Sequence, residues 1–352
     1  MVGTYYHFKT FWDVKDDDVF WCTSDIGWVV GHSYIVYAPL VAGSTTVFRE
    51  GAIDYPDPSV FYEIIEKYGV NVMFTSPTLL RMLMRYGEDY ALPYDLTSLR
   101  FLTCAGEPLN PEALKWTYEF ICGNGEWGHI VDNWWQTETG GPCLGTPATI
   151  PVRPGRVGVA LPGAELAIVD REGQPITEPN KGGLLVITRP FPHFYRTVFG
   201  DPERQAKDWN AVPGVYLTGD VALRDADGYY MVVGRADDVL NVAGHRIGSA
   251  EVESALVSNS AVAEAAVIGK PDELRGEIIK AFVTLRMGQV PSEEMEAALK
   301  LHVRGELGPI AVPAELEFMP TLPKTRSGKI MRRLLKANEL GLDPGDITTL
   351  ED

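Results

Sequence analysis

The feature that most constrains this chain is a regular alternation of helix and strand patterns between residues 58 and 135. Ser59 is predicted to cap a helix with one apolar face, and the apolar run at 70–74 follows it as a buried strand. The residues of that face are Val60, Ile64, Ile65 and Tyr68. A second helix after Pro77 and a strand at residues 99–103 continue the alternation.

The same pattern extends to a third helix and a further strand. Asn110 and Pro111 form a typical helix start, because a capping side chain precedes a proline in the first turn. Residues 128–131 then read as the next strand. Alternation of this kind predicts an α/β fold with a parallel sheet, whose ligands bind at the carboxyl ends of the strands. The segments after Thr103 and Val131 are therefore the first places to look for a site.

The pattern changes twice further along the chain. From about residue 155 to 234, short strands separated by turn signals predict antiparallel hairpins. The elements expected after Arg235 are helices from Ser249 and Ser292 and strands at 261–268 and 278–285. We therefore expect part of a large domain at 1–235, with a βα portion up to about 150 and an antiparallel β portion at 151–235. A small α+β domain is expected at 236–352.

Charge and composition exclude several classes of protein. The 352 residues include 48 acidic and 31 basic side chains, a net charge of −17, which excludes a nucleic-acid binder that relies on bulk electrostatics. The 45% of hydrophobic residues can bury a core, so disorder is excluded as the main state. The sequence has neither a long apolar run nor a leader pattern, which favours a cytoplasmic protein with no membrane partner. The four cysteines lie far apart and favour a reducing compartment over disulfides or zinc: Cys22, Cys104, Cys122 and Cys143.

A basic segment stands out near the C-terminus of this acidic chain. From Lys324 to Lys336 there are six basic residues and no acidic one. A glycine-containing loop ending at Lys329 leads into a predicted helix with a buried stripe, and such a loop can present an ammonium group to a phosphate. The stripe consists of Ile330, Leu334 and Ala337. The alternative is a solvated basic helix start.

Three further segments could hold a nucleotide. In DNWWQTETG (132–140) the tryptophans could wall a pocket, while Thr137 and Glu138 could hold a phosphate and Mg²⁺. In CAGEP (104–108) the glycine lets a flat ring approach the backbone. Asp220 follows a strand and a glycine and could accept hydrogen bonds from two ribose hydroxyls. The alternatives are core tryptophans under a polar loop, a plain turn and an ordinary turn aspartate.

Taken together and in order, seven segments resemble those of the adenylate-forming superfamily. Their amino-acid sequences are similar to those of its AMP-forming acetyl-CoA synthetases. The segments are WCTSDIGW (21–28), GHSY (31–34), AGEP (105–108), WWQTETG (134–140), GD (219–220), GRADDVLNVAGHR (234–246) and PKTRSGK (323–329). The resemblance runs from about residue 17 to the end. It implies two steps: a small carboxylate and ATP give acyl-AMP and pyrophosphate, and the thiol of coenzyme A then displaces AMP.

The resemblance implies a role for each matching residue. Lys329 would bridge the carboxylate and the α-phosphate, Thr137 would contact the α-phosphate, and Glu138 would hold Mg²⁺. Residues implied for ATP and AMP are Gly106, Glu107, Pro108, Asp132, Asn133, Trp134, Trp135, Gln136, Thr137, Asp220, Arg235 and Arg246. Those implied for the acyl pocket are Trp28, Val29, Val30, Ala105 and Trp135, and those for coenzyme A are Val30, Asp54, Ala243, Gly244 and Arg304.

The resemblance further implies a hinge, a second cation and a regulatory site. Asp237 would be the hinge about which the small domain rotates between the two steps. Val257, Asn259 and Val262 would surround the cation, and acetylation of Lys329 would remove the charge that the first step needs.

The implied substrates are acetate, ATP and coenzyme A, with Mg²⁺ as cofactor, because the indole of Trp135 would exclude long acyl chains. Four residues depart from the family pattern: Val30, Ala105, Ala243 and Asn259. Alanine at 105 removes about two methyl groups from the pocket wall, so propionate or another short acid is the alternative substrate.

The family's phosphate loop lies upstream of every segment matched here, so the resemblance covers only the C-terminal portion of a synthetase. We therefore expect an open sheet edge and an uncovered apolar face. Activity would need an N-terminal half, from a longer transcript or a separate chain, and a protein acetyltransferase and deacetylase are further expected partners. The alternative of another class is a non-catalytic fragment or regulatory piece that keeps affinity for an adenylate.

Overall fold

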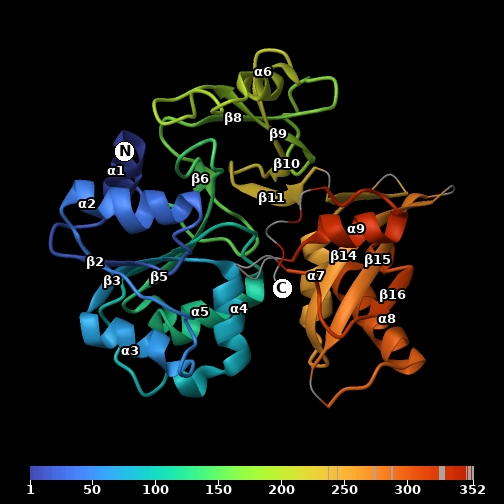
Figure 1. Cartoon of the computed structure of the whole chain (residues 1–352), viewed down its shortest axis with the longest axis horizontal. Helices are drawn as coiled ribbons and strands as arrows, with labels where there is room; N and C mark the ends of the chain where they lie inside the picture. Colours follow the sequence, from blue (N-terminus) through green and yellow to red (C-terminus); the bar gives the residue numbers. More distant parts are fainter. Residues whose placement is uncertain are drawn as a thin grey trace. The chain divides into compact units, whose positions relative to one another are not determined.

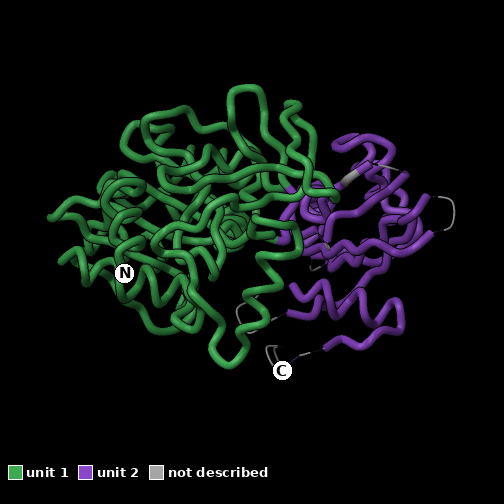
Figure 2. The backbone as a smooth tube through the Cα atoms, turned by 90° about the horizontal axis from the view of Figure 1, so that it is seen from above, with its two compact units in different colours: residues 1–218, 222–232 green, residues 219–221, 233–352 purple. Residues whose placement is uncertain are grey.

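The computed structural model describes residues 1–236, 238–243, 245–272, 275–286, 288–324, 330–345, 347 and 350, and of Arg246 only the backbone. Two compact units can be separated (Figure 2). Unit 1 consists of residues 1–218 and 222–232, and unit 2 of residues 219–221 and 233–352. The segment 219–221 lies within strand β10 (Tyr216–Arg224), so that one strand contributes to both units.

Unit 1 is built around a seven-stranded sheet with the order β2-β1-β3-β4-β5-β6-β7 (Figure 1). Neighbouring strands from β2 to β5 are parallel, whereas β6 is antiparallel to both β5 and β7. The strands are β1 (Val19–Cys22), β2 (Thr45–Val47), β3 (Val70–Thr75), β4 (Phe101–Cys104), β5 (His129–Trp134), β6 (Leu144–Gly145) and β7 (Val159–Ala160). The helices are α1 (Val2–Thr10), the π-helix η1 (Gly31–Tyr37), α2 (Ala38–Ala42), α3 (Ser59–Tyr68), α4 (Pro77–Tyr86) and α5 (Pro111–Phe120), with 3-10 turns η2 (Glu88–Tyr90) and η3 (Gly123–Gly125).

Helices cover both faces of this sheet because its strands are apolar on both sides. On β1, Trp21 belongs to the core formed with α3, α4 and α5, whereas Phe20 belongs to the core formed with α1 and η1. In Figure 1, α1 and α2 accordingly lie on one face and α3, α4 and α5 on the other. Strands β3 and β4 end at Thr75 and Cys104, which lie in register with Asp132 of β5. The α/β fold with a parallel sheet is thereby confirmed.

The next segment forms a four-stranded sheet in the order β11-β10-β9-β8. Strands β8 and β9 are antiparallel, as the turn signals predicted. The further elements of this segment are β8 (Glu165–Val169), β9 (Gly183–Arg189), α6 (Pro202–Asn210) and β11 (Tyr230–Arg235).

Unit 2 contains a five-stranded sheet with helices on both faces. Strands β13, β12, β15 and β14 follow one another as neighbours, and β16 pairs with β15 in parallel. The elements are β12 (Val239–Val242), β13 (His245–Gly248), α7 (Ser249–Val257), β14 (Val262–Asp272), β15 (Gly276–Leu285), α8 (Glu293–Leu307), η4 (Pro309–Ala311), β16 (Glu315–Phe318) and α9 (Arg332–Leu340). One core includes Leu256 of α7 and Val303 of α8, and a second packs Leu335 of α9 against Phe282 of β15.

Some details of the predicted helices are wrong. Tyr68 is 51% exposed at the end of α3, whereas Phe61 and Tyr62 are fully buried, because the helix turns a wider apolar surface toward the sheet than the predicted stripe. Ser59 does not cap this helix; its N–H donates to Oδ1 of Asp57 at 2.8 Å. On α9 the buried leucine is Leu335, next to the predicted Leu334.

Two further findings concern the whole chain. All four cysteines are buried and carry free thiols. None of the helices in the described part of the chain combines the length and the apolar character needed to cross a membrane.

Candidate active site

The loop after β4 is fastened to helix α4. Gly106 has a φ of 105°, which favours glycine, and a Cβ atom there would meet nothing within 4 Å. The Glu107 carboxylate accepts hydrogen bonds from Nη2 of Arg81, at 2.9 Å to each oxygen, and from Oγ1 of Thr78. Both donors belong to α4, whose first turn is capped by Ser76. The position of Glu107 is therefore set by a helix, beside an open stretch of backbone.

Asp132 is a buried carboxyl group at the same end of the sheet. It lies in register with Cys104, and the N–H of Leu109 donates to its Oδ2 at 3.3 Å. Burial raises the pKa of Asp132 to about 8, against the lowering effect of the N–H groups of Leu109 and Asn133. The side chain is therefore mainly a neutral acid near neutral pH, which can donate as well as accept a hydrogen bond. The Leu109 contact also ties the 105–109 loop to β5.

Asn133 and Trp134 belong to strand β5, although the predicted strand ended at residue 131. The strand is longer because these two residues pair with β6, opposite Gly145 and Leu144. The Asn133 side chain also donates to Oγ1 of Thr103, at 2.7 Å. This amide therefore fixes the ends of β4 and β5 relative to each other.

A tight turn follows β5 and is held by Gln136. The Gln136 side chain donates to the Thr218 carbonyl at 2.8 Å and accepts from the Tyr216 hydroxyl at 3.2 Å. The N–H of Gln136 donates to Oγ1 of Thr139 at 3.0 Å. The turn that carries Thr137 is thus bonded to strand β10 as well as to itself.

Thr137 and Glu138 lie at the tip of this turn, where Thr137 is exposed and Glu138 half-buried. Nη2 of Arg204 lies 3.9 Å from Oε1 of Glu138. In the described ranges, no group of three or more His, Cys, Asp or Glu side chains could hold a metal ion. A single carboxylate fits Mg²⁺ that arrives with a nucleotide, since this ion is commonly bound by one or two carboxylates plus substrate phosphates.

Three of the five predicted acyl-pocket residues share one core cluster. Val30, Ala105 and Trp135 pack in the apolar core on the α1 face of the sheet. Trp28, in contrast, is 46% exposed, and Val29 is half-buried. The structure thus brings the indole of Trp135 together with Val30 and Ala105.

In unit 2, Asp220 and Arg235 lie side by side. Oδ1 of Asp220 is 3.8 Å from Nη1 of Arg235, and the Asp220 side chain is buried. Ala243, predicted at coenzyme A, has a φ of 50°. This left-handed conformation costs a residue with a side chain about 1 kcal/mol. Two further residues predicted at coenzyme A lie elsewhere: Arg304 is exposed on α8, and Asp54 of unit 1 accepts a hydrogen bond from the Tyr86 hydroxyl at 2.8 Å.

Two of the residues predicted around a second cation have protein partners in the structure. The Val262 carbonyl accepts from Nε of Arg286 at 3.1 Å, and the side-chain oxygen of Asn259 accepts from the N–H of Ala261 at 3.0 Å. A cation near Val257, at the end of α7, would have to share Val262 with a guanidinium group. This site stays a prediction.

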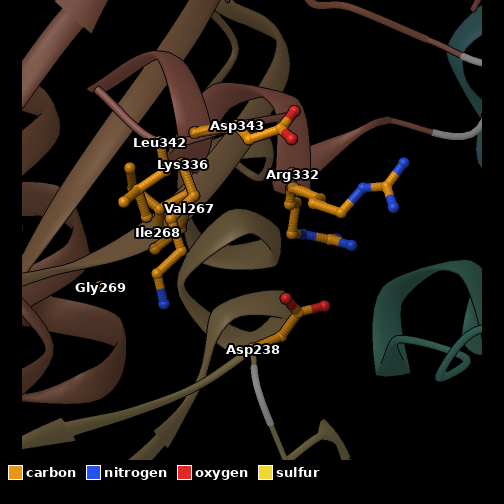
Figure 3. A pocket seen from close by; sticks show the side chains of 10 residues that line it. Asp238, Val267, Ile268, Gly269, Arg332, Lys336, Leu342 and Asp343 are labelled. Atoms are coloured by element: carbon orange, nitrogen blue, oxygen red, sulfur yellow. The ribbon is translucent and has the colours of Figure 1, made fainter. Parts of the chain in front are cut away.

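A pocket of about 170 Å³ in unit 2 lies beside α9 (Figure 3). Its charged lining consists of Asp238, Arg332, Arg333, Lys336 and Asp343. Nε of Arg332 also donates to Oε1 of Glu253 at 2.6 Å. Three carboxylates therefore accompany three cations, and we assign no ligand to this pocket.

Known proteins match this chain from its first residue. The AMP-binding enzyme family matches residues 1–193, more than half of the chain, and the AMP-binding enzyme C-terminal domain matches residues 251–329. The chain belongs to the AMP-binding enzyme family. The predicted resemblance to adenylate-forming enzymes is confirmed, and it begins earlier than residue 17.

Curated relatives of this AMP-binding enzyme are named acetyl-coenzyme A synthetase. The protein of Pyrobaculum aerophilum is 51% identical over 355 residues, and that of Deinococcus radiodurans is 50% identical over the same length. Both alignments cover 100% of this chain, but 52% and 54% of the relatives. A crystal structure of a Brucella canis acyl-CoA synthetase is similar, with a TM-score of 0.59 and 36% identity, covering 96% of this chain and 60% of that one. The chain thus spans about half the length of the curated relatives.

Some predicted site residues of this AMP-binding enzyme fall outside the described residues. These are the hinge residue Asp237, Gly244 and Lys329. The Arg246 side chain is likewise not described. Their predicted roles stay predictions.

The sequence interpretation missed several residues that shape the site. Arg81 holds Glu107, Arg204 approaches Glu138, and Tyr34 and Phe74 contact Trp135. None of them adjoins its partner in the sequence. The GHSY segment contains Tyr34, but its sequence indicates only the family resemblance and not the contact with Trp135.

Proposed function

We propose that this chain carries the adenylate-binding portion and the C-terminal domain of an AMP-forming acetate:CoA ligase. The observation that carries the proposal is the junction at the carboxyl ends of β4 and β5. There, the loop that contains Gly106 and Glu107 is bonded to the buried acid Asp132 through the N–H of Leu109. Thr137 and Glu138 lie in the turn that directly follows β5. The relatives named acetyl-coenzyme A synthetase, at about 50% identity over the whole chain, support the same assignment.

The proposed nucleotide site uses the groups at this junction. A flat adenine ring can approach the open backbone at Gly106, while Asp132 can exchange hydrogen bonds with the edge of the ring as a neutral acid. From unit 2, Asp220 is the proposed acceptor for the ribose hydroxyls, with Arg235 at its side. The Thr137 hydroxyl donates a hydrogen bond to the α-phosphate. Each of these groups positions the nucleotide rather than transferring a proton, as expected for a reaction whose barrier is mainly electrostatic.

Mg²⁺ bound to Glu138 would neutralise phosphate charge as pyrophosphate leaves. Arg204 lies close enough to Glu138 to pair with this carboxylate when no metal is bound. We propose Lys329 as the cation that stabilises the attack of the carboxylate on the α-phosphate, and as the acetylation site that regulates it.

For the substrate, we propose acetate, with propionate as the second candidate. Ala105 provides the smaller pocket wall that would admit one more carbon. Replacing Trp135 with glycine should shift the preference to longer acids. An unchanged chain-length profile would contradict the pocket assignment.

The test is calorimetric titration of the chain with AMP and with a non-hydrolysable acetyl-adenylate analogue in the presence of Mg²⁺. It is repeated with an added N-terminal fragment of a related synthetase. Binding in either case supports the proposal, and Asp220→Ala should weaken it by about tenfold or more, since charged hydrogen bonds to the ribose are lost. The exposed Asp89→Ala on η2 is the control.

A non-catalytic fragment is the candidate of another class, because the chain spans about half the length of its relatives. Binding without acetate-dependent ATP–pyrophosphate exchange, even with the added fragment, would favour it. Absence of binding in both titrations would reject the ligase assignment and favour the non-catalytic fragment. We further propose a cytoplasmic location, an N-terminal half as partner, and an acetyltransferase and deacetylase that act on Lys329.

A further inference from the structure

The indole of Trp135 is held at right angles to two buried aromatic rings. Its centroid lies 5.6 Å from the ring of Tyr34, with an angle of 87° between the planes. The ring of Phe74 lies 6.4 Å away at 79°. Edge-to-face packing of this kind is a favoured geometry for aromatic pairs.

The two supporting rings form a single surface. Tyr34 and Phe74 stack on each other at 5.8 Å with an angle of 14°. Trp12 of the segment after α1 backs them both, at 4.3 Å from Tyr34 and 5.2 Å from Phe74. Tyr34 and Trp12 are fully buried and Phe74 is 3% exposed. A close-packed surface of this kind has little room to shift, so it can fix the ring that rests on it.

The backbone that carries Tyr34 has an unusual form. Tyr34 lies in the middle of the π-helix η1, a rare conformation that often occurs at functional sites. The first residue of η1, Gly31, lies so close to the preceding segment that a Cβ atom would meet the Asp25 carbonyl oxygen at 2.5 Å. Val30, one residue before η1, belongs to the same core as Trp135. Tyr34 of this π-helix thus contacts the indole of Trp135, and Val30 packs against the same core.

We propose that Tyr34 and Phe74 are positioning residues that set the acyl-chain length accepted at this site, by fixing the indole of Trp135. This inference rests on the proposed function. A bulky ring limits chain length only if it cannot turn away from an incoming alkyl group. Ala105, in the same core, has a short side chain that offers little steric resistance to a released indole. Without either supporting ring, the pocket should admit longer acids although Trp135 is retained.

The variants are Phe74→Leu and Tyr34→Leu, with Phe74→Met as a second change at 74 that removes the ring but keeps a long, adaptable apolar side chain. Tyr34→Phe is the conservative variant, because it keeps the ring and removes only the hydroxyl. Phe101→Leu is the matched control: Phe101 is 2% exposed in the same core and on the adjacent strand, and its ring pairs with Phe11. Circular dichroism and melting curves establish which variants are folded.

The first readout is the affinity for AMP alkyl esters of increasing chain length, expressed as the ratio between the ethyl and the butyl ester. In Phe74→Leu, Phe74→Met and Tyr34→Leu this preference for the short ester should fall by about tenfold, the size expected for a few methylene groups in an apolar pocket. Tyr34→Phe and Phe101→Leu should both keep the ratio of the parent protein.

The second readout does not depend on a ligand. In protein labelled with 5-fluorotryptophan, the Trp135 fluorine resonance is assigned by its loss in Trp135→Phe. It should shift or broaden in the Leu and Met variants at 34 and 74, but not in Phe101→Leu. If the parent binds no ester, the proposed function fails while this resonance still reports whether the rings position Trp135. An unmoved resonance, or an unchanged ester ratio in folded variants of a parent that binds, overturns the proposal.

Discussion

At the scale of single residues, the ionisation of Asp132 makes the stability of unit 1 depend on pH. Its pKa is raised from 3.8 to about 8 by burial, so the folded protein keeps a proton that the unfolded chain releases. Where the unfolded state binds fewer protons, stability falls as the pH rises. This loss begins near the ordinary pKa of an aspartate and ends near the raised value.

Asp132→Asn should remove this dependence, because an amide has nearly the same shape and does not ionise. Relative to the parent, the variant should become progressively more stable from pH 4 to pH 8, by on the order of 1 kcal/mol for each pKa unit removed. Denaturant unfolding at several pH values measures the difference. Asp89→Asn, at an exposed position, should give parallel curves. A constant difference between Asp132→Asn and the parent would show that the carboxyl group does not titrate in this way.

The site could be predicted where its residues adjoin one another in the sequence. Thr137 and Glu138 follow the tryptophan pair with one residue, Gln136, between them, and the glycine of the 105–108 segment marks an open backbone. Arg81 could not be predicted, because its contact with Glu107 depends on how α4 packs against the sheet. Side chains that meet across 26 residues are determined by packing, which a local pattern does not contain.

At the scale of elements, helix α4 and the 105–109 loop behave as one piece. The Arg81–Glu107 pair is about one-third exposed on both sides, so its contribution to stability is small, about 0–1 kcal/mol. The pair instead orients the 105–109 loop, which contains the open backbone at Gly106 and the N–H that donates to Asp132.

Arg81→Met should therefore weaken AMP binding by about tenfold with little change in melting temperature, because a loose loop pays an ordering cost on binding. Calorimetric titration and a melting curve give the two quantities. Arg85→Met, on the exposed side of α4 near its end, is the matched control and should bind as the parent does. Equal effects of both substitutions would argue against a specific role of Arg81.

Helix α9 is attached to the sheet of unit 2 through Glu339. This carboxylate accepts from Lys280 at 2.6 Å and from Lys270 at 2.9 Å, and these two bonds lower its pKa, that from Lys280 most. A lowered pKa stabilises the fold above the ordinary pKa of the group, and the stabilisation is lost as the pH falls through the lowered value. Lys280 is buried, and its ammonium group pairs with Glu317 at 2.8 Å as well as with Glu339.

Glu339→Gln should destabilise unit 2 by about 1–3 kcal/mol at neutral pH, the usual cost of losing charged hydrogen bonds, and the difference should shrink at acidic pH. Hydrogen exchange of β15 and α9 amides reports this unit separately. Glu306→Gln, exposed on α8, serves as the control. A loss that is equally large at pH 3 would contradict the assignment to an ion pair.

Elements with strong local signals could be predicted, and those defined by pairing could not. The helices α3, α4, α5 and α8 follow from apolar periodicity, and the predicted cap is formed by Ser292 of α8 but not by Ser59 of α3 or Asn110 of α5. The end of β5 was missed because Asn133 and Trp134 are polar or bulky and become strand only by pairing with β6. The three-residue strand β2 and the π-helix carry no pattern that distinguishes them from a loop or an α-helix.

At the scale of the whole molecule, the net charge of −17 opposes compaction through self-repulsion. Raising the NaCl concentration to about 0.3 M shortens the range of this repulsion. The melting temperature should therefore rise by about 2–4 °C. Scanning calorimetry at several salt concentrations tests this expectation, and a fall in melting temperature with salt would mean that attractive ion pairs dominate instead.

The sheet of unit 1 ends in a strand with an exposed side. Among the described residues β2 pairs with β1 alone, and a groove of about 460 Å³ beside it includes Phe48, which is 67% exposed. The expected open sheet edge is therefore present, in a chain that spans about half the length of its curated relatives. The edge is only three residues long, which limits pairing with other chains.

The route of strand β10 has a consequence for anyone who builds chimeras of such proteins. Residues 219–221 belong to the second compact unit although the sequence returns to the first at residue 222. A single crossover after residue 235 would therefore join a C-terminal module from one parent to Asp220 and Arg235 from the other. Recombination that respects the compact units would have to exchange the 219–221 tripeptide together with everything from residue 233 onward.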